Sequence, residues 1–148
     1  MPSTFLALNV HIVFGTKHRR PLIRDDWRPR LHAYLGGCLK TLDTIPLEIG
    51  GISDHVHILA GIRATHRIAD LLREIKSEAS SWVHDELNVR DFAWQEGYAG
   101  FSVSPSSVDG VRRYIRNQED HHRQSTFEEE YRKLLTEAGI EFDERYFL

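Results

Sequence analysis

The sequence contains a single cysteine, Cys38, among its 148 residues. One thiol cannot form a disulfide within the chain, and with no second cysteine nearby it is a weak metal ligand. We therefore interpret Cys38 as a small packing residue. Long hydrophobic runs are also lacking, because charged residues interrupt the apolar stretches well before the roughly 18 residues that a membrane span needs.

The amino terminus has neither the basic nor the apolar region of a secretory signal peptide. These two absences predict a cytoplasmic protein without a membrane partner. We find no internal repeat and no low-complexity segment, and a hydrophobic content of 41% is enough for one core. We expect one globular domain over residues 1–148, with a C-terminal helix and tail over 126–148.

Positive charge is scarce, since 19 Lys and Arg stand against 22 Asp and Glu. A net charge of −3 argues against a protein that coats nucleic acid indiscriminately. The basic residues gather at one end: residues 1–50 hold seven Lys and Arg against four Asp and Glu, whereas residues 51–120 hold eight against eleven. Any contact with nucleic acid is therefore expected to have a small, local footprint.

The segment from Asp54 to Leu59 contains the first chemical signal. Its β-branched and apolar residues predict a strand, in which alternate side chains point to the same face. His55 and His57 then lie about 6 to 7 Å apart on one rigid surface, at a rise of roughly 3.3 Å per residue. A divalent metal can bridge two imidazoles at this spacing. Asp54 is a poor third ligand, because alternation turns it to the opposite face.

An isolated His-x-His is more often a pair of tolerated polar residues than a metal site. A metal site therefore requires a third ligand and a reactive group elsewhere in the chain. Residues 5–16 alternate as a strand with one fully apolar face, and Asn9 and His11 lie on the other face. The basic loop 17–21 follows at once and contributes Lys17, Arg19 and Arg20. It is equally compatible with a solvated loop and with phosphate contact.

The remaining pattern predicts an ordered series of elements. Apolar periodicity indicates helices over 27–41 and 68–86, strands over 44–51 and 92–104, and a hairpin that joins the second strand to the histidine strand. Asp25 or Asp26 is the expected cap of the first helix, and Thr65 of the second. The order strand, helix, strand, strand, helix, strand is typical of an α+β, ferredoxin-like or RRM-like antiparallel sheet with helices on one face.

A further helix is expected over 107–122. Its narrow apolar stripe allows it to dock while Tyr114 and Gln118, one turn apart, face whatever it docks on. A Tyr and a Gln at this spacing mean little alone. We expect His121 and His122 to be solvated residues at the helix end, and a role for His121 near a metal stays open as the alternative.

Together, the His-Val-His of residues 55–57, the basic loop 17–21 and the Tyr-Ile-Arg-Asn-Gln of residues 114–118 resemble the single-tyrosine HUH transposases of small bacterial insertion sequences. The REP-associated tyrosine transposases belong to the same group. The resemblance extends over nearly the whole chain to about residue 125. It adds the tyrosine-bearing helix near the C-terminus to the expected ferredoxin-like fold.

The resemblance implies specific roles for four residues. His55, His57 and Gln118 are the implied ligands of a divalent metal, and Tyr114 is the implied nucleophile. Neutral ligands leave the ion its full charge, which polarises a phosphate oxygen. Attack by the phenol oxygen leaves a 5′-phosphotyrosine and a free 3′-hydroxyl, so the strand can be rejoined without ATP. Imidazole suits Mn²⁺ better than Mg²⁺, so we expect activity with either ion and tighter binding of Mn²⁺.

The resemblance also implies partners. The family acts on single-stranded DNA, often beside a hairpin, and works as a homodimer. Whether Tyr114 serves the histidines of its own chain or those of a partner stays open. We expect Lys17, Arg19 and Arg20 to hold phosphates near the hairpin.

Two other functions stay open. One is a non-catalytic DNA- or RNA-binding module on an RRM-like sheet, although histidines stand on the strands where such modules carry stacking aromatics. The other is a metal-dependent hydrolase that uses water as nucleophile. Replacement of Tyr114 by Phe distinguishes the three functions: a transposase should lose cleavage and keep DNA binding, a hydrolase should keep cleavage, and a binding module has no cleavage to lose.

Overall fold

The computed structural model describes residues 3–147 and contains a four-stranded antiparallel sheet in the order β2-β3-β1-β4. The strands are β1 (Leu8–Gly15), β2 (Ile45–Gly51), β3 (His55–Ile62) and β4 (Ala99–Val103). The crossover helices are α1 (Arg28–Thr41) and α2 (Ile68–Glu86). This order and connectivity confirm the predicted α+β, ferredoxin-like fold, including the hairpin between β2 and β3.

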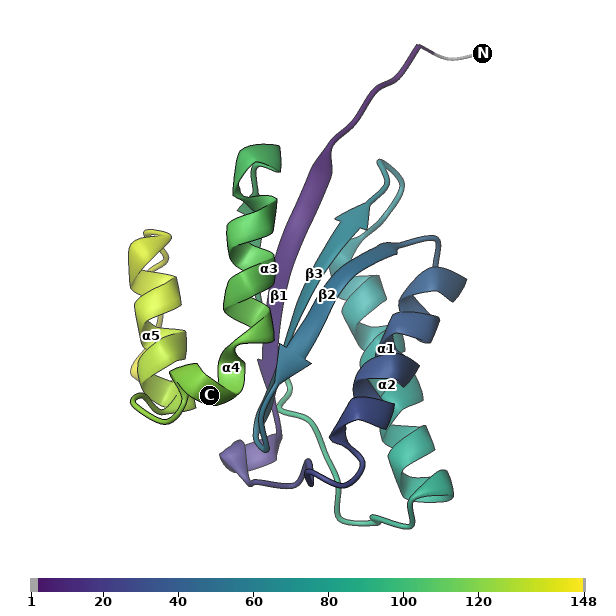
Figure 1. Ribbon diagram of the computed structural model, residues 1–148, viewed down its shortest axis with the longest axis vertical. Coiled ribbons are helices and arrows are strands. Elements are labelled where there is room, and N and C mark those ends of the chain that lie inside the picture. The colour runs from purple at the N-terminus through teal and green to yellow at the C-terminus, as the bar shows by residue number, and fades with distance from the viewer. Residues whose placement is uncertain (1–2, 148) are drawn as a thin grey trace.

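The sheet is covered on both sides (Figure 1). Helices α1 and α2 lie against one face, while the C-terminal segment covers the other face with α3 (Val108–Arg116), α4 (Gln118–His121) and α5 (Phe127–Glu137). Three short 3-10 helices, η1 (Lys17–Arg19), η2 (Pro105–Ser107) and η3 (Glu144–Tyr146), complete the fold. Within residues 3–147, no helix is both long and apolar enough to cross a membrane.

The histidine strand β3 is an inner strand, hydrogen-bonded to β1 on one side and to β2 on the other. Its alternate residues Val56, Ile58 and Ala60 enter the core beneath α1 and α2. His55 and His57 face the C-terminal helices instead, as the period of two predicts. Because both edges of β3 are paired, the two imidazoles project from a backbone held on each side.

The main core is made by the apolar stripes of α1 and α2 against one face of β1 and β3. Its fully buried side chains include Ile12, Phe14, Ile23, Leu31, Leu35, Leu39, Ile58, Ile75 and Val83. Cys38 is half-buried and packs against this core, which confirms its interpretation as a packing residue. At about 25 cal/mol per Å² of apolar surface, this face supplies most of the hydrophobic stabilisation.

The structure corrects several predicted boundaries and caps. Strand β1 begins at Leu8 rather than at residue 5, and β4 begins at Ala99 rather than at residue 92. The segment before β4 pairs with the end of β1 at one isolated bridge, between Trp94 and Thr16. The predicted caps are wrong: the residues at the starts of α1 and α2 are Trp27 and Arg67, and neither provides a side-chain cap.

The prediction of a single helix over 107–122 is also wrong. It divides at Asn117, whose φ of −97° and ψ of 24° lie outside the helical range. The division turns α4 relative to α3, so Tyr114 and Gln118 stand on opposite sides of a bend rather than along one straight face.

Candidate metal and tyrosine site

His55 and His57 are completely buried between the sheet and the C-terminal helices. Their ring centroids are 5.0 Å apart. Room for this packing depends on Gly15, which is paired with His55 across the sheet. A Cβ at Gly15 would lie 2.7 Å from the ring of Phe127, and that ring stacks on His55 with a centroid distance of 4.0 Å. The absent side chain therefore allows α5 to close over the histidines.

Each histidine has its Nδ1 held by an outer partner. Asp54 places Oδ1 at 2.8 Å from His55 Nδ1, and His11 places Nε2 at 2.8 Å from His57 Nδ1. A ring that donates its Nδ1 proton outward presents the Nε2 lone pair inward, which is the arrangement of metal-binding histidines. Asp54 accordingly orients a candidate ligand without sharing its inner face.

Tyr114 and Gln118 come from α3 and the first residue of α4. Helix α3 docks on β2 and β3 through Ile115, and it approaches so closely that a Cβ at Gly50 would lie 2.4 Å from the carbonyl oxygen of Ile115. Gln118 is 1% exposed, with Oε1 at 2.9 Å from His55 Nε2. The Tyr114 ring lies 5.6 Å from the His57 ring. Tyrosine and histidines of one chain thus meet without a partner subunit.

Glu130 of α5 lies at the centre of this group, although sequence reasoning assigned it no role. Its Oε1 is 3.2 Å from His55 Nε2 and 3.1 Å from His57 Nε2. Its Oε2 accepts hydrogen bonds from the Tyr114 hydroxyl and, at 3.0 Å, from Gln118 Nε2. One carboxylate therefore contacts both predicted histidine ligands and the predicted nucleophile.

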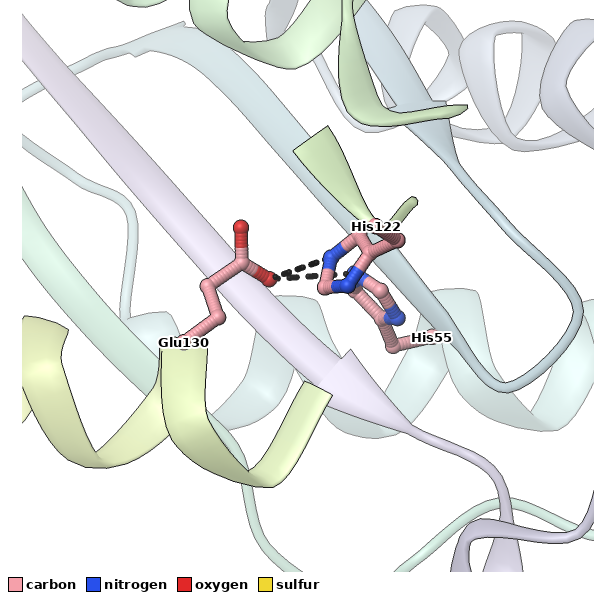
Figure 2. A group of neighbouring side chains, drawn as sticks. All are labelled: His55, His122 and Glu130. Atoms are coloured by element: carbon pink, nitrogen blue, oxygen red, sulfur yellow. Dashed lines mark hydrogen bonds and ion pairs between the residues drawn. The ribbon is translucent and has the colours of Figure 1, made fainter. Parts of the chain in front are cut away.

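His122 joins the same group, so the expectation that it is solvated is wrong. Its side chain is 3% exposed, and its Nε2 lies 3.1 Å from Glu130 Oε1 (Figure 2). The turn after α4 folds it inward. His121 is 34% exposed by side chain and lies 3.4 Å from Glu130 Oε2, at the border of the group.

Glu130 carried a sequence signal that the prediction missed. Phe127, Tyr131 and Leu135 form the buried stripe of α5, and Glu130 occupies a position of that stripe at helical spacing. A carboxylate on an apolar stripe indicates a buried partner. His122 had no comparable signal, because its burial depends on the bend at Asn117.

The charges in the group shift its pKa values in different directions. Burial opposes the charged form of His55, but hydrogen bonds to Asp54 and Glu130 outweigh burial and raise its pKa to about 8. Burial dominates for His57 and lowers its pKa to about 4. Burial and the nearby Glu130 charge raise the pKa of Tyr114 above its ordinary value, so the phenol is neutral at pH 7.

A cavity of about 650 Å³ opens beside the phenol and the carboxylate. Its lining includes Tyr114, His121, Glu130 and Lys133. Space of this size admits a phosphodiester to the Tyr114 side of the group.

The predicted basic loop lies on the surface. Its first three residues form the short helix η1, and all of its charged side chains are exposed. Arg19 pairs with Glu128 of α5, and Arg20 pairs with Asp91. The Arg19 pair ties the loop to the helix that carries Glu130.

Comparison with known proteins decides the family. The profile described as "Transposase IS200 like" matches residues 4–118, well over half of the chain. The chain belongs to the IS200-like transposase family. As a transposase it is an enzyme that acts on DNA. The matched segment contains His55, His57, Tyr114 and Gln118 and ends there, whereas His122 and Glu130 lie beyond it.

Two solved structures share the fold. A chain assigned as a transposase from Deinococcus radiodurans R1 is 20% identical, with a TM-score of 0.66 over 80% of this chain and 95% of its own. A REP-associated tyrosine transposase bound to a REP hairpin is 11% identical, with a TM-score of 0.61 over 82% of this chain and 73% of its own. No curated protein matches the sequence.

Proposed function

We propose that this IS200-like transposase cleaves and rejoins single-stranded DNA through a 5′-phosphotyrosine on Tyr114, with a divalent Mg²⁺ or Mn²⁺ ion. The observation that supports this best is the convergence of the Tyr114 hydroxyl and the Nε2 atoms of His55 and His57 on one carboxylate, Glu130. A nucleophile and a set of metal donors are thereby adjacent in one chain. We therefore propose that Tyr114 serves the histidines of its own chain.

In the proposed cleavage step, the Tyr114 oxygen forms a bond to phosphorus while the bond from phosphorus to the 3′ oxygen breaks. The phenol proton passes by way of Glu130 Oε2, which accepts its hydrogen bond, to solvent in the adjoining cavity. The departing 3′ oxygen takes a proton from solvent and becomes a free hydroxyl. Rejoining reverses these steps with a 3′-hydroxyl as the attacking group, so the covalent bond conserves the energy for ligation.

His55, His57 and Gln118 are the proposed metal ligands. Their donor set of two imidazoles and an amide oxygen fits a divalent ion that tolerates nitrogen. When bound, the ion supplies positive charge beside the reacting phosphate and the forming phenolate. The outer hydrogen bond to Asp54 keeps His55 in the tautomer that presents Nε2, and the contact of His57 Nδ1 with His11 Nε2 leaves His57 Nε2 facing inward.

The DNA partner is proposed to carry a hairpin, because the fold is shared with a transposase bound to a REP hairpin. Lys17, Arg19 and Arg20 are the proposed phosphate contacts, since all three are exposed on the loop that leaves β1. A homodimer and a single domain over residues 1–148 are parts of the same proposal.

The deciding experiment mixes the protein with Mn²⁺ or Mg²⁺ and single-stranded DNA copied from either side of its own gene. A denaturing gel then detects a covalent adduct. We expect an adduct that EDTA abolishes and that Tyr114→Phe lowers by about a thousandfold or more, with DNA binding retained. Cleavage that persists in Tyr114→Phe would identify a hydrolase that uses water. Hairpin binding without cleavage would identify a binding module.

A further inference from the structure

We infer that His122 and Glu130 are two additional ligands of the metal, so that this chain offers a site of three imidazoles, one carboxylate and one amide oxygen that selects a first-row transition ion over Mg²⁺. The inference rests on the proposed function, which placed a metal on His55, His57 and Gln118. It extends the ligand set to residues beyond the segment that the family profile matches.

The donor atoms form a closed ring. Proceeding round it, His55 Nε2 lies 2.9 Å from Gln118 Oε1, Gln118 Oε1 lies 3.0 Å from His122 Nε2, His122 Nε2 lies 3.1 Å from Glu130 Oε1, and Glu130 Oε1 lies 3.2 Å from His55 Nε2. A fifth proposed donor, His57 Nε2, is 3.1 Å from Glu130 Oε1 and lies outside the compact group formed by His55, His122 and Glu130, so it must move inward when the ion binds.

These separations have the size expected for ligands that share one ion. Metal–ligand bonds of about 2.1 Å that meet at right angles place neighbouring donors about 3.0 Å apart. The ligand atoms of His55, His122 and Glu130 all lie within 4.8 Å of one another. In Figure 2 the two imidazoles and the carboxylate approach one another from separate elements: β3, the turn after α4, and α5.

The outer contacts of His122 support the same conclusion. Its Nδ1 lies 2.6 Å from the carbonyl oxygen of Ser125 and therefore carries a proton that it donates outward. His55 Nδ1 is held in the same way by Asp54, and His57 Nδ1 lies 2.8 Å from His11 Nε2. The Nε2 atoms of His55 and His122 therefore belong to one compact group with Glu130, and His57 Nε2 joins that group through Glu130 Oε1.

The donor chemistry determines the class of ion. Mg²⁺ prefers oxygen ligands and retains several waters, whereas imidazole favours Mn²⁺ and the later divalent ions of the first row. These residues would hold the ion, which would in turn supply positive charge to a phosphate oxygen that enters the site. Metal affinity should then depend on the packing of α5 against the sheet, because α5 supplies Glu130.

The test measures metal affinity without DNA, so that its result is independent of cleavage. Mn²⁺ is titrated into the full chain by calorimetry, and the variants Glu130→Gln and His122→Asn are compared with the controls Glu129→Gln and His18→Gln, the second at an exposed histidine of the basic loop. Gln at 129 preserves the capping pair with Thr126, and both controls keep every ring donor. We expect at least about tenfold weaker Mn²⁺ binding in the two test variants and less than about twofold change in the controls.

A measurement on the unmodified protein covers the case in which a variant fails to fold. Electron–nuclear double resonance of the Mn²⁺-loaded chain should count three coordinated imidazole nitrogens, and two would overturn the inference that three imidazoles bind the ion. Unchanged or tighter Mn²⁺ binding in Glu130→Gln would show that the carboxylate merely occupies the space of the ion, and would overturn its assignment. Either failure leaves the Tyr114 adduct intact, whereas three nitrogens without an adduct would reject the proposed cleavage and retain the site.

Discussion

The two faces of the sheet are buried by different means. Under α1 and α2 the contacts are aliphatic and aromatic, and any well-packed apolar side chain of similar volume would serve. Under α3, α4 and α5 the same strands bury His11, His55 and His57 together with Gln118 and Glu130. Each of these polar groups needs a specific partner, because an unpaired buried polar atom costs about 1–3 kcal/mol.

This difference indicates that one face of the sheet mainly stabilises the fold and that the other face carries the candidate site. The aliphatic face holds the strands in register, which keeps β3 rigid. The polar face uses that rigidity to gather donor atoms from three separate segments. Four predictions test the division, in order of decreasing effect.

The largest effect should come from a cavity in the aliphatic face. Leu35→Ala removes a fully buried side chain of α1 and should lower the free energy of unfolding by about 3 kcal/mol. Denaturant unfolding measures this decrease with and without Mn²⁺. The two values should agree, because Leu35 belongs to the aliphatic core; a decrease that depends on Mn²⁺ would contradict the independence of the two faces.

The polar face should respond to metal instead. Mn²⁺ at a hundred times its dissociation constant should stabilise the native chain by about 2.7 kcal/mol, and EDTA should remove that increment. His55→Ala should abolish the increment, because it deletes a central donor. A thermal shift in Mn²⁺ that is as large in His55→Ala as in the native chain would place the ion elsewhere.

A third prediction concerns the pH dependence of stability that His32 causes, since its pKa is shifted in the direction opposite to that of His55. His55 has charged partners, whereas the buried Nε2 of His32 on α1 has no hydrogen-bond partner within residues 3–147. Burial and the charge of Arg28 lower the pKa of His32 to about 4. The unfolded chain, with its histidine near 6.5, therefore binds the proton first, and stability present above pH 6.5 is lost as the pH falls toward 4.

The size of this effect is on the order of 2 kcal/mol between pH 7 and pH 4.5. His32→Gln should remove that part of the decline, since glutamine does not titrate. Chemical denaturation at the two pH values measures both proteins, and equal declines would show that His32 is not the cause.

The smallest effect concerns the loop at the end of β1. Replacement of Lys17, Arg19 and Arg20 by Ala should weaken binding of single-stranded DNA and lower its salt dependence by about 0.7 in logarithmic slope for each phosphate that the loop no longer neutralises. The control removes two exposed arginines elsewhere, by Arg67→Ala at the residue before α2 together with Arg73→Ala on α2. A salt slope that stays the same in the loop variant would defeat the proposed contact.

Local pattern determined much of this protein. Apolar periodicity fixed the limits of α2 at residues 68 and 86 and of α1 within one residue, and the alternation of β3 fixed which side chains share a face with His55. These features depend on neighbours along the chain, so the sequence alone contains them. Tyr114 and Gln118 became candidates only through the resemblance to a transposase family, because a Tyr and a Gln one helical turn apart mean little alone.

Tertiary structure decided the rest of the site. His57 and Glu130 are 73 residues apart in the sequence. The periodicity of one segment gives no information about how close it lies to another segment in the folded chain. The bend at Asn117 turns His122 inward, and Gly15 leaves space for Phe127 to bring α5 over the histidines. Sequence pattern specifies the direction of a side chain on its own element, whereas the meeting of donors from β3, α4 and α5 depends on how those elements pack.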